Sequence, residues 1–264
     1  MKINESEVFL YVGDIREVNF KRGSFGIIVT DPPFGVGTKG TIIRRDGGKF
    51  GVAKPINTTI APWDINPPHW KEYIPKFWNW LDDYGVLILF HEKLTLMEIS
   101  RWWEEQGGTI RHIAVWCIPN PAPQARKVKW RNGTNFILIA TKNKGSGHSY
   151  RWWEGQGIDY FECPMVPGIG RVKNEKGETH PTEKPVKIFT DWLLKWWGDR
   201  EKPLLDPFCG TGSVVVAAVT LKFKYIVAGD IDLLWVKTTR YRLLTLSTQI
   251  SLPIHEGEGK QKQR

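Results

Sequence analysis

Residues 204–213 read LLDPFCGTGS, which combines a short apolar strand, a glycine-rich turn and the start of an apolar helix. Gly210 and Gly212 permit a tight turn and a close backbone approach to a ligand, and the helix N-terminus supplies free N–H groups. The apolar residues 225–229 predict the next strand, and Asp230 follows about 20 residues after the glycines, which suits an acid that binds a ribose diol. A Gly-x-Gly turn alone is most often structural, but together these features favour a cofactor-binding unit of an α/β fold.

The end of an earlier strand carries the residues on which we expect the chemistry. Residues 25–30 form an apolar run, and Asp31-Pro32-Pro33-Phe34 follows it directly. The two prolines fix φ and remove two N–H donors, so the strand end becomes a stiff rim of acceptors. The carboxylate of Asp31 and the carbonyl of Pro32 could each accept one N–H of an exocyclic amine, and Phe34 offers a flat face to a flipped base. The tetrapeptide alone is equally compatible with a simple chain turn.

With these two motifs the chain resembles the beta group of S-adenosylmethionine-dependent DNA amino-methyltransferases, which modify N6 of adenine or N4 of cytosine. Residues 31–34 match the catalytic tetrapeptide of that group, and residues 206–212 match its cofactor loop. The catalytic motif comes first, as in the circularly permuted order of the group, and the resemblance spans most of the chain. The resemblance favours adenine as the target base. Phe34 departs from the Tyr of the commonest adenine enzymes, and this departure keeps cytosine open.

The resemblance also implies which residues bind S-adenosylmethionine. Residues 13–14 look like the acidic segment near the adenine of the cofactor, and residues 180–185, HPTEKP, look like the segment that closes over its methionine end. Asp230 falls where the group places its ribose-binding acid. The expected cofactor-binding residues are Asp14, Asp31, His180, Thr182, Lys184, Asp206, Phe208, Cys209, Gly210, Thr211, Gly212 and Asp230.

The expected mechanism starts from the weak nucleophilicity of an aromatic amine, whose lone pair is delocalised into the ring. Asp31 and the carbonyl of Pro32 would bind the two amine hydrogens and aim the lone pair at the sulfonium methyl group. Positioning and electrostatics would supply most of the rate, and the base must first be extruded from the duplex. The sequence leaves open whether Asp31 itself accepts the leaving proton.

The net charge of +9 is concentrated in two stretches that are poor in acidic residues. Residues 106–153 contain no Asp or Glu, and residues 39–54, which follow the catalytic tetrapeptide, contain only Asp46. Such stretches favour a polyanion such as DNA over a merely solubilising role. We expect DNA contacts from Lys39, Arg44, Arg45, Arg126, Lys127, Lys129 and Arg131.

Alternating strands and amphipathic helices predict a Rossmann-like α/β fold, with a mainly parallel sheet, helices on both faces and a small DNA-recognition insertion. The expected strands are 27–30, 86–90, 110–116, 136–141, 204–205 and 226–228. The expected buried helix faces are Trp70, Ile74, Phe77, Trp78 and Leu81, and Val186, Phe189, Trp192, Leu193 and Trp196. Pro185 suits the first turn of the second helix, which leaves Lys184 at the helix entrance, free to reach a carboxylate.

We expect residues 1–255 to form a single methyltransferase domain, followed by a disordered tail at 256–264. The glycine-rich residues 35–68 lack periodicity, which predicts a long mobile loop over the active site. The basic, Pro/Gly-punctuated residues 119–133 and 142–177 are assigned to DNA contact and target choice. They contain Trp130, Trp152 and Trp153, which are expected to be exposed and to stack on bases. Trp152 and Trp153 could equally fill the core of a small subdomain.

Several classes of protein are excluded by composition. Cys117, Cys163 and Cys209 are too few and scattered for a disulfide framework or a C-x-x-C metal site, and the six histidines form no H-x-x-x-H pair, so no metal is expected. Cys209 is interpreted as a small packing residue. No apolar run approaches a membrane span and the N-terminus lacks a signal peptide, which predicts an intracellular, cytoplasmic protein.

Three alternatives to a DNA enzyme stay open at this point. An RNA amino-methyltransferase would use the same two motifs, although the permuted order and the segment around His180 favour DNA. A protein methyltransferase acting on glutamine has a related Asn-Pro-Pro loop, against which Asp31 and the basic stretches argue. A nucleic-acid-binding module could keep the fold and lose catalysis, but each expected position holds a competent residue. A homodimer and a cognate restriction endonuclease are further candidate partners.

Overall fold

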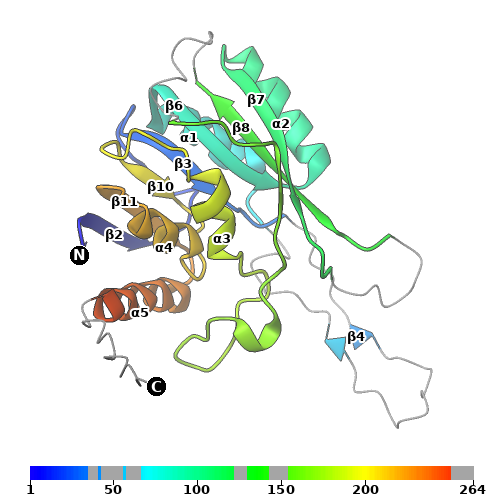
Figure 1. Cartoon of the computed structure of the whole chain (residues 1–264). Helices are drawn as coiled ribbons and strands as arrows, with labels where there is room; N and C mark the ends of the chain where they lie inside the picture. Colours follow the sequence, from blue (N-terminus) through cyan, green and yellow to red (C-terminus); the bar gives the residue numbers. More distant parts are fainter. Residues whose placement is uncertain (35–40, 43–55, 58–66, 122–129, 143–153, 251–264) are drawn as a thin grey trace, which may run out of the picture.

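The computed structural model describes residues 1–34, 41–42, 56–57, 67–121, 130–142 and 154–250. A nine-stranded sheet lies at its centre, with the strand order β1-β2-β11-β10-β3-β6-β8-β7-β9 (Figure 1). Its strands are β1 (Lys2–Ile3), β2 (Ser6–Val12), β3 (Phe25–Thr30), β6 (Leu81–His91), β7 (Thr109–Cys117), β8 (Thr134–Thr141), β9 (Tyr160–Glu162), β10 (Leu204–Asp206) and β11 (Tyr225–Asp230).

Most of the sheet is parallel. The strands β2, β11, β10, β3 and β6 all run in the same direction, and β9 is parallel to β7. Only β8, which lies between β6 and β7, and the short β1 run against their neighbours. All residues of β3 are buried, as expected for a strand covered on both faces. The predicted mainly parallel sheet is confirmed, and every strand expected from the sequence is present.

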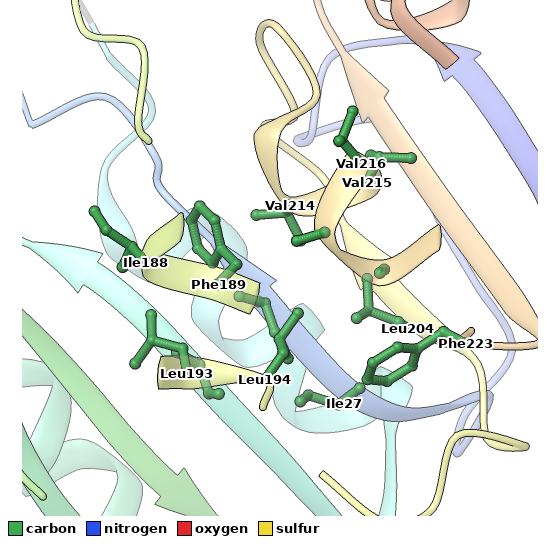
Figure 2. Packing of buried hydrophobic residues seen from close by; sticks show 14 of the residues in the cluster. Ile27, Ile188, Phe189, Leu193, Leu194, Leu204, Val214, Val215, Val216 and Phe223 are labelled. Atoms are coloured by element: carbon green, nitrogen blue, oxygen red, sulfur yellow. The ribbon is translucent and has the colours of Figure 1, made fainter. Parts of the chain in front are cut away.

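Helices cover both faces of the sheet (Figure 1). They are α1 (Trp70–Trp80), α2 (Lys93–Glu105), α3 (Val186–Ile188) with its π-helical continuation η4 (Phe189–Leu193), α4 (Ser213–Thr220) and α5 (Leu233–Ile250). α1 and α2 contribute to the core on one face, whereas α3, η4, α4 and α5 contribute to the core on the other. Figure 2 shows Ile27 and Leu204 of the sheet among the side chains of η4 and α4.

The buried face of α1 follows the predicted periodicity. His69 starts the helix with a capping box, in which its Nδ1 accepts from the N–H of Lys71 (3.3 Å) and its own N–H donates to the carboxylate of Glu72 (2.6 Å). Trp70, Ile74 and Phe77 are buried, and Trp78 is half-buried. Leu81 was expected in the same helix but begins β6.

The end of the second predicted helix differs from expectation. The N–H of Leu194 donates to the carbonyl of Phe189 at 2.9 Å, a bond between residues five apart that inserts one extra residue into the turn. The register after this turn is therefore shifted by one. Trp197 is buried in the core, and Trp196, which the periodicity had placed there, is only half-buried.

Two predicted regions lie wholly or mainly outside the described residues. Within residues 35–68 the structure describes the short antiparallel pair β4 (Thr41–Ile42) and β5 (Ile56–Asn57), and the rest of that expected mobile loop, except 67–68, lies outside the described residues. The expected tail at 256–264 also lies outside them. The structure adds β9 and the 3₁₀ turn η3 (Gly168–Gly170) within the segment 142–177.

The connections on the two sides of β3 create a place for a site. The helix α4, which connects β10 to β11, covers one face of the sheet. The helix α1, which connects β3 to β6, covers the other face. The chain therefore leaves the neighbouring carboxyl ends of β10 and β3 in opposite directions, which opens a crevice between the two connections. Among the described helices, none is both long and apolar enough to cross a lipid bilayer.

Candidate functional site

A cavity of about 190 Å³ lies at the carboxyl ends of β10 and β3. The expected catalytic residues 31–34 line it, and so do all the expected cofactor-binding residues except Gly212. Gly212 instead stands behind the cavity wall as the N-cap of α4. Residues far apart in the sequence are thus brought together as the motif order implied.

Asp31 has two carboxylate oxygens in different situations. Its Oδ2 forms an ion pair with Nζ of Lys184, which reaches it from the entrance of α3. Its Oδ1 is buried and has no hydrogen-bond partner among the described residues. Burial raises the pKa of this carboxyl, and the charge of Lys184 opposes that rise. Because an unpaired buried acceptor is costly, Oδ1 is a site for a donor that the described protein residues do not supply.

The aromatic ring beside Asp31 is held in place by its neighbours. Phe34 stacks on His91 at the end of β6, with ring centroids 5.1 Å apart and planes inclined by 22°. Nδ1 of His91 accepts from the N–H of Glu92 at 2.7 Å, and burial lowers the pKa of His91 to about 4. The stacked imidazole is therefore neutral at pH 7. Nζ of Lys184 lies 5.8 Å from the ring centroid of Phe34, within the range of a cation–π contact.

The cofactor loop needs its glycines for two separate reasons. Gly212 has φ +79°, and a Cβ atom there would lie 2.5 Å from Cγ2 of Thr239. Gly210 has φ +48°, and a Cβ atom there would lie 3.4 Å from Nε2 of His180. The hydroxyl of Thr239 donates to the carbonyl of Gly210 at 2.9 Å, so α5 supports the loop from behind. Both positions thus combine left-handed backbone with close neighbours.

The two carboxylates on the cofactor side accept hydrogen bonds from the protein itself. Oδ1 of Asp206 accepts from the hydroxyl of Thr30 (2.8 Å) and from the N–H of Phe208 (3.3 Å). Asp230 accepts from the N–H of Gly210 through Oδ2 (2.9 Å) and from the N–H of residue 232 through Oδ1 (3.0 Å). Burial raises the pKa of Asp206 to about 8 and also raises the pKa of Asp230.

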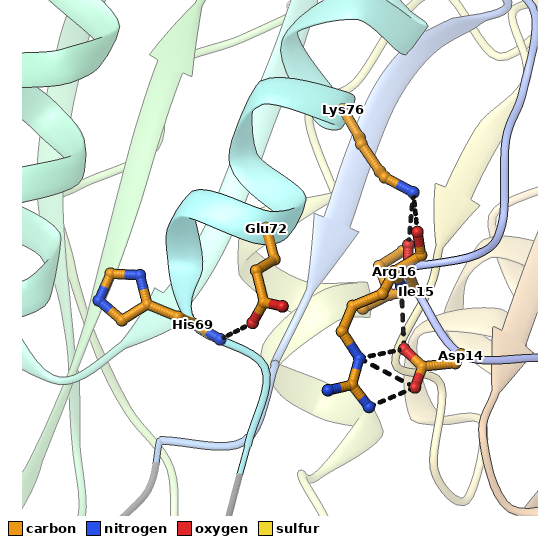
Figure 3. Close-up of polar contacts among 6 residues, drawn as sticks. All are labelled: Asp14, Ile15, Arg16, His69, Glu72 and Lys76. Atoms are coloured by element: carbon orange, nitrogen blue, oxygen red, sulfur yellow. Dashed lines mark hydrogen bonds and ion pairs between the residues drawn. The ribbon is translucent and has the colours of Figure 1, made fainter.

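The expected acidic segment, residues 13–14, lines the cavity, and Figure 3 shows the polar contacts of Asp14. The guanidinium of Arg16 holds the carboxylate of Asp14 through Nε (2.9 Å) and Nη2 (2.5 Å), and this hydrogen bonding lowers the pKa of Asp14. Nζ of Lys76 on α1 donates to the carbonyls of Ile15 (3.0 Å) and Arg16 (2.5 Å), which fixes the turn between β2 and β3. Asp14 thus reaches the cavity as half of an ion pair.

The segment 180–184 forms the opposite wall. His180 packs edge-on against Trp235 of α5, with ring centroids 4.8 Å apart, and burial lowers the pKa of His180 to about 4. The hydroxyl of Ser213 donates to the carbonyl of Lys184 at 2.7 Å, which ties this segment to the start of α4. Glu183 is buried and accepts from the N–H of Val172 at 2.9 Å. The segment 180–184 is therefore held by Val172, by the start of α4 and by α5.

Sequence reasoning missed several residues of the site. Arg16 and Trp235 line the cavity, His91 stacks on Phe34, and Arg242 of α5 donates to the carbonyl of Thr211 at 3.1 Å. None of these belongs to a motif. Asp14 and Arg16 carry opposite charges and lie two residues apart. This spacing was the one signal in the sequence that could have indicated the ion pair between them.

The residues expected to contact DNA lie mainly outside the described part of the chain. Lys39, Arg44, Arg45, Arg126, Lys127 and Lys129 are not described. Arg131 is exposed, and its guanidinium donates to the carbonyl of Pro121, away from the cavity lining. The neighbouring Trp130 is almost fully exposed at 95 %.

All three cysteines lie within the described residues. There, no cluster of His, Cys, Asp and Glu side chains could hold a metal ion. The three cysteines are free, and Cys209 is buried at the cavity wall, which agrees with its interpretation as a packing residue. Burial raises the pKa of the Cys209 thiol, so it is a poor nucleophile.

Comparison with known proteins adds independent findings. A family model described as DNA methylase, N6_N4_Mtase, matches residues 25–233. The chain is 24% identical over 260 residues to the type II methyltransferase M2.MboI of Moraxella bovis, covering 93% of this chain and 88% of that protein. It is 26% identical over 216 residues to the type II methyltransferase M2.LlaDCHI of Lactococcus lactis subsp. cremoris, covering 78% and 77%.

Two solved structures show the same fold. The crystal structure of the M1.HpyAVI–SAM complex superposes with a TM-score of 0.60 at 18% identity, covering 89% of this chain and 100% of that one. The PvuII DNA methyltransferase, described as cytosine-N4-specific, superposes with a TM-score of 0.57 at 13% identity, covering 93% of both chains. These likenesses confirm the predicted α/β architecture.

Proposed function

This chain belongs to the N6/N4 family of DNA methylases, and from that premise we propose that it transfers a methyl group from S-adenosylmethionine to N6 of a flipped adenine in duplex DNA. The observation that carries the proposal is the buried Oδ1 of Asp31, which has no partner among the described residues and lies in a cavity shared with the glycine-rich loop. An exocyclic amine is a donor of the kind that this atom requires.

The described residues fit S-adenosylmethionine. Gly210 and Gly212 have positive φ angles, and a Cβ atom at either position would crowd a neighbouring side chain. Gly210 and Thr211 line the cavity. Asp230 stands at the end of the next strand for the ribose, and residues 180–184 form the wall that would face the methionine end. When bound, the cofactor supplies an electrophilic methyl group on a sulfonium.

In the proposed mechanism, this chain's residues position the target amine. Oδ1 of Asp31 accepts a hydrogen bond from one N–H of the amine, and the carbonyl of Pro32 accepts a hydrogen bond from the other. These two hydrogen bonds localise the lone pair on the amine nitrogen. Lys184 occupies Oδ2, and its charge opposes the rise that burial causes in the pKa of Asp31. Phe34, fixed by His91, stacks on the base. Most of the rate then comes from positioning and a preorganised electrostatic environment.

The choice of adenine over cytosine is the finer part of the proposal. Three of the four residues of the tetrapeptide match those of the commonest adenine enzymes, and a purine offers Phe34 the larger stacking face. N4 of cytosine is the second candidate, because its amine presents the same two hydrogens to Asp31 and Pro32. The family match to DNA methylases argues against an RNA target, and the presence of residues 31–34 in the cavity lining argues against loss of catalysis.

Nucleoside mass spectrometry tests the proposal. DNA treated with the protein and S-adenosylmethionine carrying a CD3 group should yield trideuterated N6-methyldeoxyadenosine after complete digestion. Labelled N4-methyldeoxycytidine would select the second candidate, and label on carbon 5 of cytosine would overturn the mechanism, because that reaction needs a cysteine nucleophile. RNA treated in parallel separates the two substrates. Sequencing that maps the modified bases then gives the recognition sequence.

We also propose that Lys39, Arg44, Arg45, Arg126, Lys127, Lys129 and Arg131 contact the phosphates of the DNA. Neutralising Arg126, Lys127, Lys129 and Arg131 together should reduce the log–log salt slope of DNA binding by about 0.9 for each lost contact. Neutralising the exposed Lys222 and Lys224, which pair with Glu5 and Glu201, is the matched control. An unchanged slope in the first variant would place the DNA surface elsewhere.

The remaining partners follow from the same substrate. We propose that residues 1–255 act as one domain in the cytoplasm, where the DNA of a prokaryotic cell lies. Type II methyltransferases such as the relatives above suggest a cognate restriction endonuclease, and a homodimer is the oligomeric state to test by light scattering.

A further inference from the structure

The turn η3 presents an isolated apolar side chain to solvent. Ile169 is fully exposed, between Gly168 and Gly170. A Cβ atom on Gly168 would meet no heavy atom within 4 Å, so the tip of this turn stands clear of the described protein around it. A β-branched side chain is stiff at χ1 and thus keeps its shape at such a tip.

The turn is firmly anchored on both sides. Before it, the side chain of Asn120 accepts from the N–H of Met165 (2.8 Å) and donates to its carbonyl (3.3 Å). After it, the guanidinium of Arg171 donates to the carbonyls of Val166 (3.3 Å) and His180 (3.3 Å). The exposed tip is therefore carried by a braced arm.

The arm is built onto the wall of the cavity. His180 lines that cavity, and Val172 donates its N–H to the buried carboxylate of Glu183, which lines it as well. In Figure 1 the arm lies, in light green, at the same end of the molecule as the β4 strand. Arg171 and Lys173 place two cationic side chains within four residues of the tip, between Glu162 and Glu175.

We propose that Ile169 is the wedge that enters the DNA stack when the target base is extruded. This inference rests on the proposed function, which requires a flipped base to reach the buried Oδ1 of Asp31. Proteins that kink or open DNA insert single apolar side chains between bases, and a braced arm beside the pocket provides such a side chain. A single isoleucine flanked by glycines is too small a patch to hold a protein partner.

Methyl transfer to two DNA duplexes tests the wedge. Both carry the recognition sequence mapped for the parent protein, and in one of them the target base lies opposite an abasic site, where extrusion costs least. With Ile169→Ala, the rate on the fully paired duplex should fall at least about tenfold. The rate on the abasic duplex should stay within about twofold of the parent rate, and Ile169→Leu should restore transfer on the paired duplex.

The control is Leu94→Ala on α2, which removes the same number of atoms from an exposed side chain outside the segments assigned to DNA contact and should change neither rate. Equal losses on both duplexes with Ile169→Ala, or no loss on the paired duplex, would overturn the wedge while the parent remained active. A parent protein that methylated no DNA in the mapping experiment would contradict the proposed function instead.

Discussion

The acids on the two sides of the cavity differ in how their oxygens are used. On the cofactor side, Asp206 and Asp230 accept hydrogen bonds from hydroxyl and backbone donors of the protein. On the catalytic side, Asp31 shares one oxygen with Lys184 and leaves the other buried without a partner among the described residues. Hydrogen bonds within the protein fix the shape of a binding surface, whereas an unused buried acceptor marks the place where substrate must bind. The two halves should therefore fail in different ways.

The largest effect is expected at the catalytic acid. Asp31→Ala removes the acceptor of the amine, and steady-state methyl transfer should fall roughly 10²–10³-fold or more, by analogy with the loss of one electrostatic contact to a transition state. The matched control is Asp191→Ala, which removes an exposed carboxylate on η4 and should keep the parent rate. A control that lost activity equally would show that the loss is not specific to Asp31.

The next effect tests the backbone on the cofactor side. Gly212→Ala places a Cβ atom 2.5 Å from Thr239 at φ +79°, which should lower the free energy of unfolding by roughly 1–3 kcal/mol. Urea denaturation measures the change. Gly168→Ala, where a Cβ atom meets nothing within 4 Å, should be nearly neutral. Equal stability of the two variants would contradict the described geometry of the loop.

A smaller effect tests the charge of Lys184. Burial raises the pKa of Asp31 and Lys184 lowers it, so Lys184→Gln should move the acid limb of the pH profile of kcat/KM to higher pH. Lys187→Gln, three residues later on the exposed surface, should leave the limb in place. An unshifted limb in Lys184→Gln would mean that this ion pair does not set the charge of Asp31.

The smallest effect concerns Asp206. Burial raises its pKa to about 8 in the folded protein, from a reference value of 3.8. The folded state therefore holds the proton more tightly, so the associated stability is present below pH about 4 and is lost as the pH rises through about 8. Asp206→Asn should weaken the fall in Tm between pH 5 and pH 8. A fall in Tm as steep as in the parent would assign the pH dependence to other groups.

Much of the fold could be predicted because its signals are local. The apolar run of β3 is buried on both faces, so it stands out in the sequence, and Asp31, Asp206 and Asp230 each follow or end such a strand. Since carboxyl ends of parallel strands share one edge of the sheet, the predicted parallel sheet is consistent with the three acids lining one cavity. The strand β2 escaped notice because its outward residues Phe9 and Val12 are apolar and exposed, which hides the alternation of a half-buried strand.

The rest depends on contacts between distant segments. The extra residue in η4, which exchanges Trp196 for Trp197 in the core, leaves no mark in a run of apolar residues. The hydroxyl of Thr239 supports the cofactor loop from a helix that carries no motif. The position of Lys184 at the entrance of a helix suggested that its side chain would reach a carboxylate. Only the packed structure shows that this carboxylate is Asp31.

Calorimetric titration of S-adenosylhomocysteine into the parent protein, Asp31→Ala and Asp230→Ala tests the division between the two halves most directly. Asp230→Ala loses a charge-assisted hydrogen bond, which is worth about 1.5–3 kcal/mol, so its affinity should fall on the order of tenfold to a hundredfold. Asp31→Ala should bind with nearly the parent affinity, although it no longer transfers methyl groups. A loss of affinity in Asp31→Ala as large as that in Asp230→Ala, or methyl transfer by Asp31→Ala at near-parent rate, would contradict the assignment of its free oxygen to the target amine.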